Sequence, residues 1–267
     1  DFKPLFERLC VIDPNISLIE RILTVQKPFY NKCGQDLYIS LPFCPTKCEY
    51  CSFITAPIEK TRAYVEKYIN CLVSEIASVK PFLKNLRSVY VGGGTPFVLS
   101  VEQLTPIYAA INDILSGKVE YTVEAGRPDV FSDDKLKLSK DFGVTRICVN
   151  PQSFNDKTLE AIGRKHTAVQ TIKAYEMAKK YGFDINIDLI AGLAEETVSD
   201  FEKSLDTAIS LNPENITVHT LSLKAGAKLK ENVKRLNIAG IADMIAISRE
   251  KLTKAGYEPY YLYRQKY

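Results

Sequence analysis

The sequence of 267 residues has no tryptophan, two methionines and two histidines, and it contains no apolar run near the roughly 20 residues that span a bilayer. Its first residues do not form a secretory signal. It has no basic block or acidic tail, and 35 lysines and arginines against 32 aspartates and glutamates give a net charge of +3. These absences argue against a membrane span and give no reason to expect nucleic acid as a partner. We expect a cytoplasmic protein.

The composition is that of an ordinary globular protein, with 46% hydrophobic and 25% charged residues. It excludes collagen, a small disulfide-rich protein and a chain too polar to bury a core. The sequence does not begin with methionine, and near its end lies a strand-like aromatic run at Tyr257–Tyr263. Because natural ends are more often polar and frayed, we expect this chain to be a piece of a longer protein.

Short β-branched or alternating runs are separated along the chain by amphipathic stretches. The sequence predicts six strands, at Asp36–Leu41, Ser88–Val91, Glu120–Glu124, Thr145–Asn150, Asp184–Ile190 and Asn215–Leu221. It predicts seven helices, at Thr61–Phe82, Val101–Leu115, Ser132–Lys140, Asp156–Ile162, Val169–Tyr181, Ser199–Leu211 and Ile238–Lys254. The first helix is expected to place its apolar side chains on one face, formed by Tyr64, Tyr68, Leu72, Ile76 and Val79.

The helix ends carry their own signals. Ser132, Asn155 and Ser199 are predicted to cap the N-termini of three helices, and Gly182 is predicted to end another. Strict alternation of strand and helix, with a repeat of about 30 residues, predicts an α/β fold with parallel strands and right-handed crossovers. It leaves open whether the strands form a flat doubly wound sheet or a complete or partial barrel.

In both architectures the chemistry gathers at the carboxyl ends of the strands. Polar and glycine residues stand there along this chain, namely Cys44, Gly92–Thr95, Glu124, Gln152, Asp188 and His219. The sequence therefore predicts one site at that end of the sheet.

Seven cysteines are present, and three of them, Cys44, Cys48 and Cys51, form a C-x3-C-x2-C cluster on the loop after the first predicted strand. An odd number of cysteines in a chain without a signal argues against a disulfide framework. Three thiolates can hold three irons of a 4Fe-4S cluster and leave the fourth iron open to a substrate or cofactor. The alternative is a structural zinc, with Cys33 or Cys71 as its fourth ligand.

The remaining cysteines are expected to be structural. Cys71 lies on a predicted helix, and Cys10 and Cys148 are interpreted, like Cys71, as small buried hydrophobic residues.

The cysteine motif, with Tyr50 just before its last cysteine, resembles that of the radical S-adenosylmethionine (SAM) superfamily. The VGGGTP run at Val91–Pro96 resembles the glycine motif of the same superfamily. The resemblance implies a 4Fe-4S cluster on Cys44, Cys48 and Cys51, whose open iron takes the amino and carboxylate groups of SAM. Glycines would let the backbone approach the amino group of SAM without an intervening Cβ atom.

A narrower resemblance extends over about residues 36–267. The motifs YISLPFC, GGGTP, VEAGRPD, VNPQSF, IGRKHT, DLIAGL and ITVHTLSLK occur in the order seen in oxygen-independent coproporphyrinogen III oxidases, and they are most similar to the HemZ, or coproporphyrinogen dehydrogenase, branch. The family implies a partial (β/α)6, TIM-like barrel of radical SAM type over 36–256. Residues 1–35 would be the remnant of a longer N-terminal region, and 257–267 the start of a truncated C-terminal region.

The resemblance also implies contacts with the methionyl part of SAM. Tyr38 would hydrogen-bond the carboxylate, and Arg164 would form a bidentate contact with it. Gly93, Gly94 and Thr95 would surround the amino group.

Other residues would contact the nucleoside part of SAM. Glu124 would accept a hydrogen bond from the ribose or the amino group, and Gln152 and Asp188 would accept from ribose hydroxyls. Tyr50 would lie near the adenine.

The two histidines are read differently. His166 is interpreted as a structural residue, whereas His219, near the mouth of the expected barrel, is a candidate for the substrate site. Arg127 is a second candidate, because a guanidinium group suits the propionates of a tetrapyrrole.

The family resemblance implies a decarboxylase. The reduced cluster would cleave SAM, and the resulting 5′-deoxyadenosyl radical would remove hydrogen from a propionate of coproporphyrinogen III, which loses carbon dioxide and one electron to give a vinyl group. Repeated once, this yields protoporphyrinogen IX in haem biosynthesis. The enzyme would need an electron donor of flavodoxin or ferredoxin type.

One position departs from the dehydrogenase pattern. Phe53 stands where those enzymes carry a fourth cysteine, and the HemW-type relatives also lack that cysteine. Three alternatives therefore stay open: a haem chaperone that does not turn over, another haem-modifying radical SAM enzyme such as a ring-opening methyltransferase, and a zinc-stabilised binding module.

Overall fold

The computed structural model describes residues 3–30, 33–224, 226–229, 236 and 239–261. The chain divides into two compact units, one formed by 34–248 and the other by the described parts of 1–33 and 249–267. Neither described unit contains a helix long and apolar enough to cross a membrane. The larger unit carries all of the predicted site residues.

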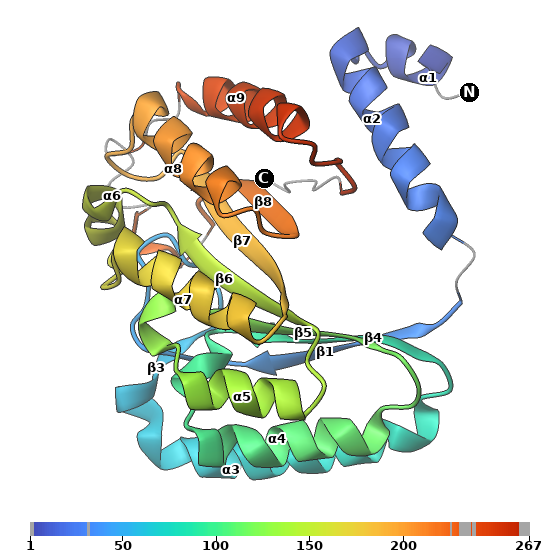
Figure 1. The fold of residues 1–267 in the computed structure, drawn as a ribbon, viewed down its shortest axis with the longest axis vertical. Helices are drawn as coiled ribbons and strands as arrows, with labels where there is room; N and C mark the ends of the chain where they lie inside the picture. The colour runs from blue at the N-terminus through green and yellow to red at the C-terminus, as the bar shows by residue number, and fades with distance from the viewer. Residues whose placement is uncertain (1–2, 31–32, 225, 230–235, 237–238, 262–267) are drawn as a thin grey trace. The chain divides into compact units, whose positions relative to one another are not determined.

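The larger unit is built on six parallel strands (Figure 1). They are β1 (Gln35–Leu41), β4 (Leu86–Gly93), β5 (Glu120–Gly126), β6 (Arg146–Gln152), β7 (Asp184–Ala191) and β8 (Asn215–Thr220). The six predicted strands are therefore confirmed, with ends that differ by up to two residues.

The order of the strands decides between the two predicted closures. They lie side by side in chain order, β1-β4-β5-β6-β7-β8. Each crossover therefore moves in the same direction, whereas a doubly wound sheet reverses direction at a switch point. Figure 1 shows the connecting helices along the outside of a curved sheet, and β1 and β8 form its two edges. This arrangement is a partial (β/α)6 barrel, as predicted.

The outer helices are α3 (Ile58–Val79), α4 (Val101–Ile114), α5 (Asp133–Asp141), α6 (Asp156–Ala161), α7 (Ala168–Lys180) and α8 (Val198–Ser210), and α9 (Ile241–Lys254) follows β8. Ser132 and Asn155 cap α5 and α6 as predicted, because their side chains accept backbone N–H groups. Gly182 follows α7 with φ +67°, a conformation that favours glycine. The predicted cap Ser199 is wrong: the N-cap is Thr197, two residues earlier, and it forms a reciprocal capping box with Asp200.

The predicted apolar face of α3 is confirmed at Leu72 and Ile76, which are buried, and at Tyr68 and Val79, which are half-buried, but not at Tyr64. Its buried side chains are Val65, Ile69, Leu72 and Ile76, while Tyr64 is exposed. Cys71 lies off this stripe and is exposed, so the prediction of a buried Cys71 is wrong. Cys10 is also exposed, at a turn after α1 with φ +56°, whereas Cys148 is buried as predicted.

Several elements were not predicted. The helices α1 (Lys3–Arg8) and α2 (Asp13–Gln26) belong to the smaller unit, where the Arg21 guanidinium pairs with Glu258 at 2.7 Å. A two-residue strand pair, β2 (Phe43–Cys44) with β3 (Ala56–Pro57), was missed because each strand is too short to show alternation. The expected strand-like run near the end is not found at residues 257–261, and 262–263 lie outside the described residues.

The core fills the space between the barrel strands and the helices. Phe97 illustrates its packing: the ring is fully buried after β4 and lies 5.3 Å from the ring of Phe131. Such a side chain makes contacts on all sides, and its removal leaves a cavity that its neighbours only partly fill.

We therefore expect Phe97→Ala to lower the free energy of unfolding by about 3–5 kcal/mol. Val169, on the exposed side of α7, provides a control, because Val169→Ala should change it by about 0.5 kcal/mol or less. Urea unfolding followed by far-ultraviolet circular dichroism measures both variants. Equal effects of the two substitutions would contradict the packing described here.

Candidate functional site

The cysteine motif lies on a loop, residues 42–57, that joins β1 to α3 and is called the cysteine loop here. Its two ends are held together by the parallel pair β2–β3 and by a 2.8 Å hydrogen bond from Ala56 N to Pro42 O. The loop therefore leaves the carboxyl end of β1 and returns to it, which keeps all three cysteines at one end of the barrel.

The glycine run after β4 lies directly against the start of the cysteine loop. Gly94 N donates to Leu41 O and Thr95 N to Phe43 O, both at 2.7 Å. A Cβ atom on Gly94 would come within 2.5 Å of Phe43 O, and one on Gly93, whose φ is +100°, within 2.5 Å of Ser40 Oγ. Gly94 is thus required by close contact with the loop, and Gly93 by its positive φ and its close contact with the end of β1.

Thr95 extends this contact to a predicted metal ligand. Its hydroxyl donates to Cys44 Sγ at 3.6 Å, and its side chain is buried. The GGGT run and the cysteine motif, which are separated by about 40 residues in the sequence, thus form one structure.

Two further segments hold the far side of the loop. Glu49 N donates to Ile162 O at 3.1 Å, and Leu229 N donates to Glu49 O at 2.9 Å. The ring of Tyr50 packs against a buried cluster of apolar side chains that includes Leu159 and Leu193. The peptide groups of the loop therefore take their partners from β6–α6 and from the chain after β8.

The three thiols are partly or fully covered. Cys48 is buried, and Cys44 and Cys51 are half-buried. Burial raises the pKa of Cys44 and of Cys51 above the ordinary value, and the neighbouring Cys48 adds to the rise. Three thiolates placed this close need a cationic group to stabilise them.

The arrangement bears on the kind of metal. Within the described residues, no three cysteine, histidine, aspartate or glutamate side chains converge on one point that could hold a single ion. A tetrahedral zinc site needs four ligands on one ion. A 4Fe-4S cluster instead binds each cysteine to a different iron, so its thiolates need not converge. Three thiols on one short loop are a donor set that fits a 4Fe-4S cluster with one iron left open.

Inside the barrel, Glu124 lies among polar groups from neighbouring strands. Asn150 Nδ2 donates to its carboxylate at 3.4 Å, and a Cβ atom on Gly92 would come within 2.7 Å of Glu124 Oε2 and of the Tyr90 ring. The Tyr90 ring stacks on Tyr38 at 5.8 Å, so Tyr38 lies on the wall beside Glu124. Burial and the negative charge of Asp188 raise the pKa of Glu124 to about 7.

Asp188 is the second carboxylate of the interior. Asn186 Nδ2 donates to it at 2.7 Å, and Thr217 also supports it. Burial raises the pKa of Asp188, while His219 and the hydrogen bonds oppose this rise. Two acidic groups with raised pKa values therefore share one part of the barrel.

Arg164 connects this interior to the cysteine loop. Its Nη1 donates to Asn150 O at 2.5 Å and its Nη2 to Tyr50 Oη at 2.9 Å. Burial opposes the charge of Arg164, but Tyr50 and Cys48 outweigh this effect and raise its pKa. Gln152, with φ +73°, is buried nearby and donates from Nε2 to Asn150 O at 3.3 Å.

Two buried polar atoms of this region have no hydrogen-bond partner among the described residues, namely Arg164 Nε and Asn150 Oδ1. Buried polar atoms are almost always paired, so a donor and an acceptor left over at one site indicate space for a polar ligand. Together with the glycine cradle and the two carboxylates, they fit a cofactor that carries amine, carboxylate and hydroxyl groups.

The structure thus brings together Cys44, Cys48, Cys51, Tyr38, Tyr50, Gly93, Gly94, Thr95, Glu124, Gln152, Arg164 and Asp188 at the carboxyl ends of the strands. Sequence reasoning missed Tyr90, Asn150, Asn186 and Thr217. A signal was present: polar residues at alternate positions of adjacent strands, as in Asn186–Asp188 and Thr217–His219, share one face.

Arg127 and His219 are the two predicted candidates for the substrate site, and the structure places them in different surroundings. Arg127 is 2% exposed and pairs with Asp129 and Thr46, so the prediction that it receives substrate propionates is wrong. His166 is buried, in agreement with its structural interpretation. His219 is exposed at the end of β8 and lies near Asp188.

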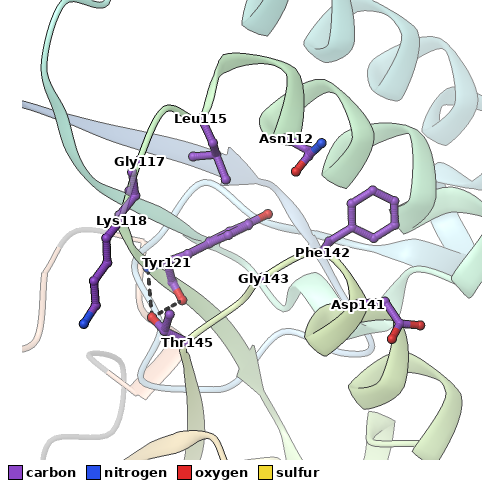
Figure 2. A pocket seen from close by; sticks show the side chains of 10 residues that line it. Asn112, Leu115, Gly117, Lys118, Tyr121, Asp141, Phe142, Gly143 and Thr145 are labelled. Atoms are coloured by element: carbon purple, nitrogen blue, oxygen red, sulfur yellow. Dashed lines mark hydrogen bonds between the residues drawn. The ribbon is translucent and has the colours of Figure 1, made fainter.

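A hollow of about 600 Å³ lies elsewhere, at the amino ends of β5 and β6 (Figure 2). The Thr145 hydroxyl bridges the backbone N and O of Tyr121 there, at 3.0 and 3.1 Å. None of the predicted site residues lines it. In parallel α/β barrels the active site lies at the carboxyl ends of the strands. This hollow lies at the amino ends, so it is not the candidate active site.

The fold and the cysteine loop together define a barrel protein with a three-cysteine cluster site. The family model of the Radical SAM superfamily matches residues 38–208, and the chain belongs to this superfamily. Membership implies a 4Fe-4S cluster and SAM.

The relatives are proteins of tetrapyrrole metabolism by name. The chain is 37% identical over 266 residues to the oxygen-independent coproporphyrinogen-III oxidase-like protein HemZ of Bacillus subtilis, across 93% of this chain and 52% of that protein. It is 38% identical over 193 residues to the heme chaperone HemW of the same organism, across 70% of this chain and 50% of HemW. The chain thus spans about half the length of these relatives.

A solved structure supports the fold. The coproporphyrinogen III oxidase HemN of Escherichia coli, a radical SAM enzyme, superposes with a TM-score of 0.77 at 23% identity, over 86% of this chain and 54% of HemN. The predicted partial barrel of radical SAM type is therefore confirmed.

The raised pKa of Glu124 makes stability depend on pH. The folded chain keeps a proton up to about pH 7 that the unfolded chain releases near pH 4.5, so this stabilisation is complete below 4.5 and is lost as pH rises through 7. Glu124→Gln removes the titration. In the metal-free protein, the free energy of unfolding of Glu124→Gln minus that of wild type should increase by about 1–3 kcal/mol from pH 5 to pH 8.

Urea unfolding at both pH values measures this gain, and Glu160→Gln, on the exposed face of α6, is the control. The Glu160 variant should differ from wild type by the same amount at pH 5 and pH 8. A pH-independent difference for Glu124→Gln would show that its carboxylate is solvated in the folded chain.

Proposed function

We propose that this chain is the cofactor-binding barrel of an oxygen-independent coproporphyrinogen III oxidase, which converts two propionates of coproporphyrinogen III to vinyl groups and gives protoporphyrinogen IX. The observation that carries the proposal is the contact between the GGGT run and the C-x3-C-x2-C loop, which builds a three-thiol site beside a polar barrel interior. Similarity to the HemZ protein over 93% of the chain supports the tetrapyrrole substrate.

The cysteine loop would hold the cluster. Cys44, Cys48 and Cys51 would each bind one iron, and Thr95 would donate to the Cys44 sulfur, which stabilises its negative charge. When bound and reduced, the cluster and SAM supply one-electron chemistry that removes a hydrogen atom from a substrate carbon.

The barrel interior would orient SAM. Gly93 and Gly94 let β4 approach the start of the cysteine loop closely, which places the GGGT run beside the cysteines. Tyr38 and Arg164 offer donors to the methionyl carboxylate. Arg164 already binds Tyr50 and Asn150 through its terminal nitrogens, which fixes the guanidinium plane while Nε–H remains to be paired. A fixed donor loses little entropy when a ligand binds.

The acidic residues would hold the other polar groups of SAM. Glu124 has a raised pKa, so at neutral pH it is divided between its protonated and ionised forms and can donate to or accept from the ligand. A cationic amine beside it would favour the ionised form. Gln152 and Asp188 would bind the ribose hydroxyls, and Tyr50 would lie beside the adenine.

The proposal includes two partners, the tetrapyrrole substrate and an electron donor of flavodoxin or ferredoxin type. The structure leaves the tip of the cysteine loop open: Phe53 is 65% and Ile54 98% exposed. We place the protein in the cytoplasm, where reduced thiols and such donors occur.

A haem chaperone is the second candidate. Phe53 occupies the position at which the dehydrogenases carry a fourth cysteine, and its apolar ring is exposed on the cysteine loop. The similarity to HemW of Bacillus subtilis favours the same candidate. A chaperone would bind haem in stoichiometric amounts and form no protoporphyrinogen.

The test is anaerobic reconstitution followed by assays of SAM cleavage, of protoporphyrinogen IX formation and of haem binding. It uses this chain and a form extended to the length of its relatives. We expect SAM cleavage from both and product from the extended form. Cys48→Ser should abolish cluster absorbance and SAM cleavage, whereas Cys71→Ser, an exposed cysteine of α3, should leave both unchanged.

The outcomes separate the candidates. Stoichiometric haem binding without product from the extended form supports the chaperone. If the protein binds zinc in place of iron, or if Cys48→Ser still forms a full cluster, both the oxidase and the chaperone proposals are contradicted.

The role proposed for Arg164 gives a separate prediction. Arg164→Ala should weaken SAM binding by about 1.5–3 kcal/mol, the usual contribution of a charge-assisted hydrogen bond, while the cluster is retained. Isothermal titration calorimetry on the reconstituted protein measures the affinity.

Two variants control this measurement. Tyr50→Phe removes the hydroxyl that Arg164 binds but keeps the guanidinium, so it should change the affinity less than Arg164→Ala. Lys165→Ala, at the exposed neighbouring position, should not change it. Equal affinities of wild type and Arg164→Ala would show that Arg164 only supports the loop.

A further inference from the structure

A group of charged side chains around the buried Arg127 lies against the first half of the cysteine loop. Arg127 donates from Nε and Nη2 to the two oxygens of Asp129, at 2.9 and 2.7 Å. Its remaining terminal nitrogen, Nη1, donates to Thr46 Oγ1 at 2.5 Å. Thr46 stands midway between Cys44 and Cys48. The contacts proposed above for the cluster and SAM use none of these three side chains.

The geometry of this group is tightly determined. Arg127 follows Gly126, which ends β5 with φ +79°, and the next residues form a single 3₁₀ turn, Pro128–Val130. Asp129 in that turn binds the guanidinium in a two-point contact, which fixes the plane of the group. Arg127 is 2% exposed, so its charge is removed from water and depends on these partners.

His166 lies next to Asp129 but forms no hydrogen bond with Arg127, Asp129 or Thr46. Its ring is buried, both ring nitrogens lack a hydrogen-bond partner among the described residues, and Nδ1 lies 3.9 Å from Asp129 Oδ1. Burial, and then the charges of Arg164 and Arg127, lower the pKa of His166 to about 3 in spite of Asp129. The ring is therefore neutral at physiological pH, and it lies beside Asp129 without adding a charge to the group.

The two arginines hold the two halves of the loop. Arg164 binds Tyr50, next to Cys51, and Arg127 binds Thr46, between Cys44 and Cys48. The span from Cys44 to Cys48 is the longer of the two between ligands, and its side chains would otherwise be free to sample many conformations. An anchor in the middle of this span restricts both flanking thiols.

We propose that Arg127 is a positioning residue: held by Asp129, it fixes the Cys44–Cys48 segment through Thr46 before a cluster binds. A segment fixed in this way binds the cluster without first becoming ordered, and it releases iron more slowly when oxidant attacks. The second consequence rests on the proposed cluster, whereas the ordering of the loop does not.

The experiment acts on Thr46, because a substitution of buried Arg127 can prevent folding. Thr46→Val keeps the shape of the side chain and removes the acceptor of Arg127 Nη1, and Thr46→Ser keeps the hydroxyl. Hydrogen exchange of the peptide spanning the cysteine loop, measured by mass spectrometry on the metal-free protein, reports loop order. Thermal unfolding of the same protein reports global stability.

In Thr46→Val we expect exchange in the cysteine loop to rise at least fivefold, with the exchange of β4 to β7 unchanged and the melting temperature within about 3 °C of wild type. In the reconstituted protein we expect the absorbance near 400 nm to decay at least threefold faster in air. Thr46→Ser should restore wild-type behaviour in each measurement.

Exchange at the wild-type rate in Thr46→Val would overturn the proposal. A uniform rise across the sheet with a large fall in melting temperature would also overturn it, since Thr46 would then support the whole fold rather than the loop. If wild type acquires no cluster, the proposed function fails, yet the exchange measurement still decides the role of Arg127.

Discussion

The approach of the glycine run to the cysteine loop is the constraint on which the rest of the site depends. Gly94 and Thr95 donate to Leu41 and Phe43 across 2.7 Å, and no side chain larger than hydrogen fits at Gly94. Because β4 lies beside β1 in the sheet, this contact is available as soon as the two strands pair. It places the Cys44 thiol against Thr95 at the carboxyl end of the sheet.

The barrel interior beside the cysteine loop contains buried polar groups that lower the stability of the folded chain. Burial raises the pKa values of Glu124 and Asp188, and the charge of Asp188 adds to the rise at Glu124. Arg164 keeps one buried nitrogen without a hydrogen-bond partner among the described residues. A chain selected only for stability would place apolar side chains there. The natural explanation is a ligand whose amine, carboxylate and hydroxyl groups pair with these residues, and superfamily membership names that ligand as SAM.

Much of this could be predicted from the sequence, because the fold and the ligands depend on local signals. The strand and helix pattern predicted the parallel sheet, and C-x3-C-x2-C placed its three thiols on one loop. The direction of Arg127 could not be predicted, since a guanidinium after a strand can turn to the barrel or to its own Asp129, and only the 3₁₀ turn decides. The exposed Cys71 was missed because the apolar stripe of α3 depends on the neighbouring α4 as well as on its own periodicity.

The central claim is that the cysteine loop holds a four-iron cluster with one iron left to SAM. Mössbauer spectroscopy of the protein reconstituted with ⁵⁷Fe, recorded with and without SAM, tests it most directly. The account predicts four irons per chain, one of which changes its isomer shift when SAM is added while the other three do not. A spectrum that does not respond to SAM, or a chain that takes up zinc in place of iron, would contradict it.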